Sequence, residues 1–188
     1  MQPVAYASLA AAPWKNGGGV TRELACYPAG AGFDDFLWRV SIADVNQSGP
    51  FSRFPGIDRV ILLLDGGGMI LHSDAGDHAL TEALVPHGFR GEAQVDAKLV
   101  SPSCDFNLML RRGRAEGAIS VWRNSAMLEA GRAARLLFCA DGRWKIDGDC
   151  VLNQGDHLLI ESGMANDIAM LEAGTLICVD VALVSQID

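Results

Sequence analysis

The chain has 188 residues, of which 49% are hydrophobic and 20% charged, and its formal net charge at pH 7 is −8. This size and composition are typical of a globular protein with a substantial core in one large or two small domains, and they exclude an intrinsically disordered chain. The negative net charge argues against nucleic acid or an anionic membrane as a partner.

The sequence gives no sign of export or membrane insertion. The opening segment MQPVAYASLAAAPW lacks a basic stretch followed by a long apolar one, so no secretory signal is predicted. The apolar run Val60–Leu64 is far shorter than the roughly 20 residues that a membrane-spanning helix needs. Five cysteines occur without a CxxC pair, and we expect them to be buried, reduced thiols. We therefore predict a cytoplasmic protein.

Strand patterns dominate the chain. Trp38, Val40 and Ile42 alternate with Arg39 and Ser41, which predicts a strand whose two faces carry different side chains. Further along, two apolar segments at 60–64 and 69–71 flank the glycine-rich segment 65–68, and this pattern predicts a hairpin around a glycine turn.

Short strands are predicted along the remainder of the chain, and turn pairs such as Asp141-Gly142, Asp147-Gly148 and Gly155-Asp156 separate most of them. Their ranges are 106–110, 118–122, 135–139, 143–146, 157–160, 168–171 and 176–184. Helical periodicity occurs only at Ser125–Arg135, where Gly131 weakens it.

This organisation predicts an all-β protein with little helix. Many short strands at close spacing are typical of a sandwich or barrel, and the Gly155-Asp156 step resembles the corner turns of jelly-roll barrels. We expect two β-roll (jelly-roll-like) barrels in one chain, over residues 1–115 and 116–188.

The charges are distributed unevenly. Residues 1–60 carry equal numbers of cationic and acidic side chains, so the whole negative charge lies in residues 61–188. The cations of the first segment are Lys15, Arg22, Arg39, Arg53 and Arg59. An acidic protein with its cations near a glycine loop could hold a small anion there, although the charge count alone favours random scatter.

The sequence contains no recognisable catalytic or cofactor motif. The four histidines are His72, His78, His87 and His157, and no HxH pair begins a mononuclear metal site of the kind that β-roll enzymes use. GxSxG and the phosphate loop GxxxxGK[ST] are also absent, and no cysteine has a histidine close in sequence. We therefore predict no metal, no cofactor and no catalytic residue.

A polar constellation surrounds the segment PWKNGGGVTRE, residues 13–23. Lys15 and Asn16 precede three glycines, which can adopt positive φ and turn backbone N–H groups toward a ligand. Arg22 and Glu23 follow on a predicted strand, where neighbouring side chains point to opposite faces, so at most one of the two can line a given pocket.

Each of these features also has an ordinary structural explanation. The glycine triplet could be an exposed hairpin turn, and Trp14 and Trp38 suit core positions. Arg39 could form a structural ion pair with a nearby aspartate, and Arg59 could lie on the solvated surface. From the residues alone, the chain is a β protein with a candidate anion pocket.

Four segments taken in order, PWKNGGGVTRE, WRVSIADV, GPFSRFPGIDR and DFNLMLRR, resemble the HutD/Ves family of bicupin proteins. These motifs span residues 13–112, and the second half matches mainly in its β-rich character. The resemblance implies two cupin β-rolls without the usual metal-binding histidines, and a ligand pocket in the first. Carried over motif by motif, it implies the ligand-binding residues Lys15, Asn16, Arg22, Glu23, Trp38, Arg39, Ser41, Arg59 and Asn107.

The family is associated with bacterial histidine utilisation. The resemblance therefore implies a non-catalytic sensor or governor that binds a small anionic metabolite, either urocanate or a formylated or formiminated glutamate. Two alternatives remain open. One is a metal-independent enzyme acting on a formyl or formimino C–N bond, with Glu23 as base and Lys15 or Arg39 stabilising the oxyanion. The other is an interaction protein, a homodimer for example, in which the apolar strand 176–184 pairs across a sheet edge.

Overall fold

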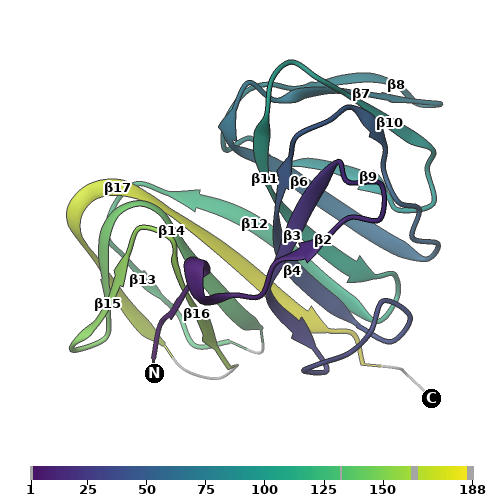
Figure 1. The fold of residues 1–188 in the computed structure, drawn as a ribbon. Coiled ribbons are helices and arrows are strands. Elements are labelled where there is room, and N and C mark those ends of the chain that lie inside the picture. Colours follow the sequence, from purple (N-terminus) through teal and green to yellow (C-terminus); the bar gives the residue numbers. More distant parts are fainter. Residues whose placement is uncertain (1, 132, 162–164, 186–188) are drawn as a thin grey trace. The chain divides into compact units, whose positions relative to one another are not determined.

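The computed structural model describes residues 2–131, 133–161 and 165–185, and these are folded almost entirely as β-strands (Figure 1). Within these residues the helical structure is limited to the 3₁₀ turn η1 (Tyr6–Ser8). The expectation of an all-β protein with little helix is confirmed. No helix in this part of the chain has the length and apolar character needed to cross a membrane.

The helix expected at Ser125–Arg135 is wrong. Strand β13 (Ala126–Leu128) lies inside this segment, and β14 (Ala134–Ile146) has begun by its end. Both strands pair with β17 (Asn166–Leu183). Because the helical pattern was short and contained a glycine, sheet hydrogen bonds to a distant strand outweigh it.

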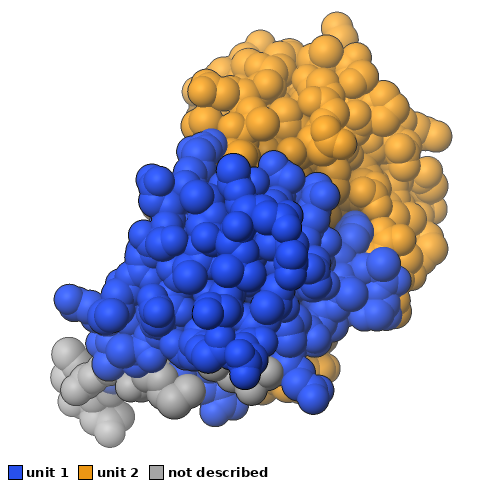
Figure 2. Space-filling model, turned by 90° about the vertical axis from the view of Figure 1, so that its left-hand side faces the viewer, with its two compact units in different colours: residues 1–9, 115–188 blue, residues 10–114 orange. Residues whose placement is uncertain are grey.

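The chain divides into two compact units (Figure 2). Residues 10–114 form the N-terminal unit, and residues 1–9 with 115–188 form the C-terminal unit. The expected division placed residues 1–9 in the first half. They belong to the C-terminal unit because β1 (Val4–Ala5) pairs with β16 (Asp156–Ile160).

The N-terminal unit contains two antiparallel sheets. The six-stranded sheet has the order β2 (Ala12–Pro13), β3 (Gly19–Tyr27), β4 (Trp38–Val45), β11 (Ser103–Arg111), β6 (Ile57–Gly66) and β9 (His87–Arg90). The four-stranded sheet has the order β5 (Gly49–Pro50), β10 (Val95–Leu99), β7 (Met69–Ser73) and β8 (Gly76–Leu80). Apolar side chains from both sheets, among them Ile61, Leu63, Leu71 and Val95, form one buried cluster.

The hairpin expected around residues 65–68 is wrong, because β6 and β7 belong to different sheets. Gly66 and Gly68 have φ of +92° and +77°, and they carry the chain around a corner from one sheet to the other. A Cβ at either position would overlap a backbone carbonyl oxygen, that of Pro102 or of Leu80. The glycines are therefore used for close backbone approach at a corner rather than for a two-residue turn.

The six-stranded sheet arranges polar side chains in rows across β4, β11 and β6. The rows given by the register are Ala43, Asp105 and Leu63; then Ser41, Asn107 and Ile61; then Arg39, Met109 and Arg59. Alternation places all nine on one face of the sheet. The first row adjoins the apolar cluster, to which Ala43 and Leu63 belong, and polarity increases toward the third row.

The C-terminal unit is one seven-stranded sheet of order β1-β16-β14-β17-β12, with β13 on β17 and β15 on β14. Its further strands are β12 (Ala115–Trp122) and β15 (Cys150–Asn153). Figure 1 shows β17 arching along this sheet, and β14 follows it with register shifts near Asp141. The turn expected at Asp141-Gly142 is therefore a bend inside β14, whereas Asp147-Gly148 does close the β14–β15 hairpin.

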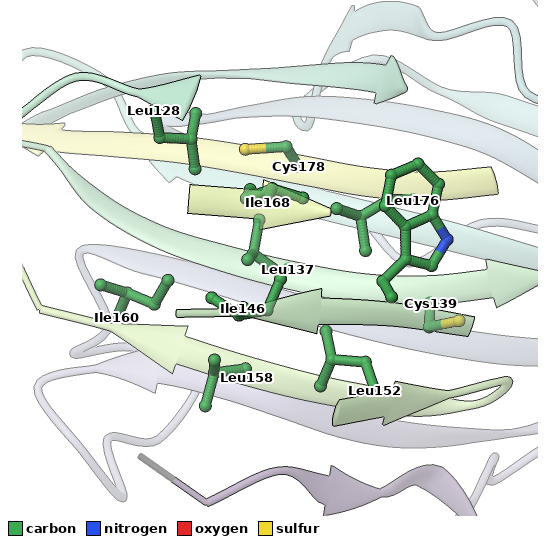
Figure 3. Close-up of a cluster of buried hydrophobic side chains, with 11 residues drawn as sticks. Leu128, Leu137, Cys139, Ile146, Leu152, Leu158, Ile160, Ile168, Leu176 and Cys178 are labelled. Carbon is green, nitrogen blue, oxygen red and sulfur yellow. The ribbon is translucent and has the colours of Figure 1, made fainter. Parts of the chain in front are cut away.

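The interior of the C-terminal unit is filled by apolar side chains. Leu137, Ile146 and Ile168 point into a common cluster, and all three are fully buried (Figure 3). Trp144, also fully buried, occupies the same cluster. A close-packed interior of this kind is typical of a structural core.

The homodimer hypothesis placed the apolar strand 176–184 at a sheet edge, and this expectation is wrong. This segment forms the second part of β17, which has β14 on one side and β12 on the other. Because the backbone of residues 176–181 is paired on both sides, this part of the strand offers no free edge for a second subunit.

Candidate functional site

A cavity of about 780 Å³ opens in the N-terminal unit, and every residue that lines it lies between positions 12 and 111. A volume of this size is typical of a site for a small metabolite. Its cationic lining residues are Lys15, Arg39, Arg53, Arg59 and Arg111, and its acidic ones are Asp34 and Asp105. In a chain whose net charge is −8, this concentration of cations gives the cavity a charge complementary to that of an anion.

Arg59 on β6 is buried among aromatic rings. It is 8% exposed, and its guanidinium carbon lies 4.9 to 5.7 Å from the ring centroids of Phe51, Phe54 and Phe89. Burial lowers the pKa of Arg59 to about 10, while Asp105 opposes this shift, so the side chain stays cationic at neutral pH. Its Nε–H has no hydrogen-bond partner among the described residues. A buried donor of this kind is costly, and a ligand acceptor could satisfy it.

Asn107 on β11 links Arg59 to Asp105. Its Oδ1 accepts a hydrogen bond of 2.7 Å from Arg59 Nη2, and its amide nitrogen donates to Asp105 Oδ1. Asp105 is 1% exposed, and burial raises its pKa to about 7, although Arg59 and the amide of Asn107 act in the opposite direction. The buried part of the cavity thus holds a cation and a carboxyl group joined through one amide.

Arg39 on β4 provides a second cationic centre. Its Nε donates to Glu23 Oε2 at 2.6 Å, and its Nη1 donates to Ser41 Oγ at 3.1 Å. Phe33 lies against the guanidinium, with 5.2 Å between the ring centroid and the guanidinium carbon. These contacts fix the orientation of Arg39. They also give it the structural ion pair that the sequence suggested, although the partner is a glutamate and not an aspartate.

Three further cations line the cavity without a carboxylate partner among the described residues. Arg111 donates to the backbone carbonyls of Phe36 and Asp34, at 2.8 and 2.7 Å. Arg53 donates to the carbonyl of Glu92 at 3.0 Å. Lys15 is exposed. Because carbonyl acceptors are neutral, these cations contribute uncompensated positive charge to the cavity.

The glycine loop after Lys15 and Asn16 is the turn of the β2–β3 hairpin. The N–H of Gly17 donates to the carbonyl of Trp14, and the N–H of Gly18 donates to Asn16 Oδ1, both at 3.0 Å. The expectation that the loop N–H groups face a ligand is therefore wrong for these two. Their hydrogen bonds hold the turn together.

Gly19 sets how closely this hairpin approaches β4. A Cβ on Gly19 would overlap the carbonyl oxygen of Asp44 and would lie 3.3 Å from the ring of Trp14. Trp14 is anchored by its Nε1–H, which donates to Thr21 Oγ1 at 2.8 Å. The glycine loop thus positions Trp14, Lys15 and Asn16 as one wall of the cavity.

Comparison with known protein families shows to which family the chain belongs. A family model described as HutD matches residues 6–178. The chain belongs to the HutD family. Among its relatives is Protein Ves of Escherichia fergusonii, which is 39% identical over 142 residues, covering 74% of this chain and 72% of that protein.

Solved structures support the same assignment. HutD from Pseudomonas fluorescens SBW25, in a formate condition, is 29% identical and superimposes with a TM-score of 0.85 over 97% of this chain and 98% of that chain. A Cupin 2 conserved barrel domain protein from Leptotrichia buccalis is 9% identical, with a TM-score of 0.63 over 98% and 96% of the chains. The second likeness shows the fold alone, and this HutD-family chain therefore has a cupin-like β fold.

Most residues that the family resemblance implied as ligand-binding lie together. Those that line the cavity are Lys15, Asn16, Arg39, Ser41, Arg59 and Asn107. Glu23 lies beside them, in a recess of about 70 Å³ that it shares with Arg39 and Phe33. Ligand binding by these residues remains a prediction.

Arg22 and Trp38 are not among the residues that line the cavity. Arg22 pairs in register with Ile42, while Glu23 pairs with Ser41, so the expectation that Arg22 and Glu23 point to opposite faces is confirmed. Arg22 Nη1 instead lies 2.9 Å from Asp44 Oδ2. Trp38 is 4% exposed and stacks on Tyr27, with ring centroids 6.3 Å apart, so it is a packing residue.

Several lining residues of this HutD-family site were missed. The missed residues Asp105 and Met109 alternate with Asn107, which was expected at the site, within DFNLMLRR, so the strand period that was applied to β4 would have placed them on the same face as Asn107. Arg111 continues the same alternation. The aromatic residues of the 51–54 segment lie in a loop, where no period indicates which side chains turn inward.

The histidines and thiols lie outside the cavity lining. Within 2–131, 133–161 and 165–185, no group of three or more His, Cys, Asp or Glu side chains is placed to hold a metal ion. His78 and His87 stack, with ring centroids 3.4 Å apart. All five cysteines are free thiols, and burial raises the pKa of each, to about 12 for Cys139 and Cys178. They are therefore poor nucleophiles.

Proposed function

We propose that this chain is a non-catalytic binding protein that holds a small carboxylate metabolite in its N-terminal unit and acts as a sensor or governor of histidine utilisation. The observation that carries this proposal is Arg59, a buried cation whose Nε–H lacks a partner among the described residues. A guanidinium binds carboxylates through paired hydrogen bonds, and Arg39 supplies a second one in the same cavity. The link to histidine utilisation rests on the HutD family.

The lining also suits the expected ligands in shape. Trp14, Phe33, Phe51 and Phe54 line the cavity together with the arginines, so one side of a ligand can pack on aromatic rings while its acid group binds a guanidinium. Urocanate, with its planar ring and carboxylate, and N-formyl- or formimino-glutamate, with more than one polar group, have this chemistry. A cytoplasmic location is the natural one for such a role.

We interpret the two units as two cupin barrels, so that the chain is a bicupin. Support comes from the separate apolar cluster of each unit and from the likeness to a cupin barrel protein. In this interpretation the N-terminal barrel is the binding barrel. The C-terminal barrel is structural, because its cluster of buried side chains contains Trp144 and ten other residues.

An enzyme that uses Glu23 as a general base is less well supported. Glu23 Oε2 already accepts the hydrogen bond from Arg39 Nε at 2.6 Å. A carboxylate engaged in this way is poorly placed to take a proton from a substrate. Incubation of the protein with each candidate ligand, with metal ions and without, tests this alternative, and any turnover would favour it over simple binding.

Thermal unfolding in the presence of a ligand panel tests the proposal. The panel consists of urocanate, N-formyl-glutamate, formiminoglutamate, glutamate and formate. A ligand at about 100 times its dissociation constant stabilises the fold by roughly 2.7 kcal/mol, which raises the unfolding temperature by several degrees. We expect a shift with at least one carboxylate of the pathway, and no shift with any of them would contradict the proposal.

Arg39→Ala and Arg143→Ala form a matched pair of variants. Arg143 Nη1 lies 3.0 Å from Glu172 Oε1 in the C-terminal unit, so each substitution removes one Arg–Glu ion pair. We expect Arg39→Ala to abolish the ligand-induced shift and Arg143→Ala to retain it. An unchanged shift in Arg39→Ala would remove this residue from the site.

A further inference from the structure

Asp105 is an unusual lining residue for a cavity that binds anions. It is 1% exposed and faces the cavity beside Arg59, the residue proposed to hold the ligand. The groups that act on it are Arg59 from β6, Asn107 from its own strand and Asp44 from β4. The apolar cluster adjoins it through Leu63, the residue paired with it on β6. Asp105 therefore meets one cation, one amide and one further acid where the cavity adjoins the apolar cluster.

The charge balance of this region changes when a carboxylate binds. Arg39 is already neutralised by Glu23, so the cation that faces Asp105 is Arg59. With Asp105 ionised, a carboxylate at Arg59 would place two negative charges on one buried guanidinium, because the other unpaired cations of the lining, Lys15, Arg53 and Arg111, are not among the groups that act on Asp105. Such an arrangement is costly, because repulsion is strong where the dielectric is low and ions have lost their hydration. A proton on Asp105 removes the excess charge.

We propose that a carboxylate ligand enters this cavity together with one proton, which is taken from solvent and held by Asp105. The inference rests on the proposed function, because it concerns the same cavity. In the ligand-free protein, Arg59 and ionised Asp105 balance each other through Asn107. In the complex, the ligand carboxylate neutralises the positive charge of Arg59, and Asp105 is a neutral acid.

In the ligand-free protein, Asp105 can take up a proton at little cost in free energy near neutral pH. Burial raises the pKa of Asp105 to about 7, so its two protonation states are close in free energy at that pH. A neighbouring ligand carboxylate raises the pKa further. The ligand therefore binds more tightly to the protonated form, and its affinity falls as pH rises through the range in which free Asp105 loses its proton.

Formate is a suitable probe because it carries a carboxylate and no other titratable group. We expect its dissociation constant to rise by about tenfold between about pH 6 and pH 8, the change produced when binding raises the pKa of one group by about two units. Isothermal titration calorimetry in two buffers of different ionisation enthalpy should also show proton uptake on binding at neutral pH.

The variant Asp105→Asn tests whether Asp105 is the group that takes up the proton. The substituted amide keeps an oxygen that can accept from Asn107, and it cannot ionise. We expect formate affinity in this variant to be nearly independent of pH, and at about pH 8 to exceed that of the parent protein by about tenfold. Asp180→Asn is the matched control, since it removes a carboxylate paired with Arg135 in the C-terminal unit. It should keep the parent pH profile.

The outcomes separate this inference from the proposed function. Binding that is equally tight across the pH range and proceeds without proton uptake overturns the inference and leaves carboxylate binding intact. An unchanged pH profile in Asp105→Asn also overturns it, by assigning the proton to another group. Absence of carboxylate binding at every pH contradicts the proposed function itself. If Asp105→Asn fails to fold, proton uptake by the parent protein still decides the question.

Discussion

Arg59 and Asp105 are charged residues whose environment the local sequence does not reveal. Both lie in strands, and Arg59 follows Asp58 in a segment that suits the solvated surface. In the structure both are buried, and Asn107 joins them across neighbouring strands. The residue types suggested an anion site, but burial depends on which strands become neighbours. That information lies in pairings between residues far apart in the sequence, such as Arg59 with Met109.

The buried carboxyl of Asp105 also predicts how stability depends on pH in the absence of ligand. Its pKa is about 7 in the folded protein and about 4 in an unfolded chain, so the folded protein binds the proton more tightly. The free energy of unfolding therefore falls as pH rises from about 4 to about 7, by up to about 4 kcal/mol from this group. Asp105→Asn should lack this contribution.

Denaturant unfolding of the parent protein and Asp105→Asn at several pH values measures the effect. We expect the stability of the parent, relative to the variant, to decline between about pH 4 and pH 7 and to level off above that range. A relative stability that rises with pH over this range would mean that Asp105 has a lowered pKa in the folded protein.

At the scale of elements, the period-2 pattern was reliable where a strand has one polar and one apolar face. It placed Arg39 and Ser41 together on β4, and both line the cavity. It could not tell that β6 and β7 lie in different sheets, because a glycine-rich connection suits a hairpin and a sheet corner equally well. The sheet to which each strand belongs is decided by later strands: β11 pairs with β6, and β10 pairs with β7.

The glycine loop of the β2–β3 hairpin gives a test at this scale. Gly17 has φ of +72° and open space around it, so Gly17→Ala should cost about 1 kcal/mol of stability through backbone strain alone. Gly19→Ala would drive a methyl group into the carbonyl oxygen of Asp44 on β4. Because backbone must move to accommodate it, we expect a loss of about 2 kcal/mol or more.

Urea unfolding and formate binding measure the two effects. Gly19→Ala should also weaken formate binding, since the new methyl group would press on the ring of Trp14 in the cavity wall. Gly49→Ala is the control, with φ in the ordinary range and nothing within 4 Å of the new methyl group. Equal losses for Gly17→Ala and Gly19→Ala would indicate that the hairpin can move away from β4 at little cost.

At the scale of the whole molecule, the sequence was informative about the fold class and about where the chain divides into two units. Strand spacing indicated an all-β chain with a change near residue 115, and the compact units divide at residue 114. It misjudged the first nine residues and the strand 176–184, for a common reason. Both depend on long-range pairing, of β1 with β16 and of β17 with two neighbours, and such pairing leaves no local pattern.

The cavity lies in the N-terminal unit, whereas the interior of the C-terminal unit is filled by apolar side chains, and this difference leads to a prediction. Leu137 is fully buried in the cluster of the C-terminal unit, so Leu137→Ala should lower the free energy of unfolding by about 2 to 5 kcal/mol. Formate affinity, measured where the variant is still folded, should remain as in the parent, because all lining residues lie in the N-terminal unit. A weakened affinity would show that the C-terminal unit supports the site.

The pairing of β1 with β16 has a consequence for the order in which the protein is made. A ribosome releases the chain in the direction from N- to C-terminus, so Val4 emerges before the N-terminal unit, whereas its partner His157 emerges only after the whole of that unit. Domains generally fold as units during synthesis. We therefore expect the cavity-bearing segment 10–114 to fold first, while β1 waits unpaired. The sheet of the C-terminal unit would then incorporate a strand that was translated before the N-terminal unit.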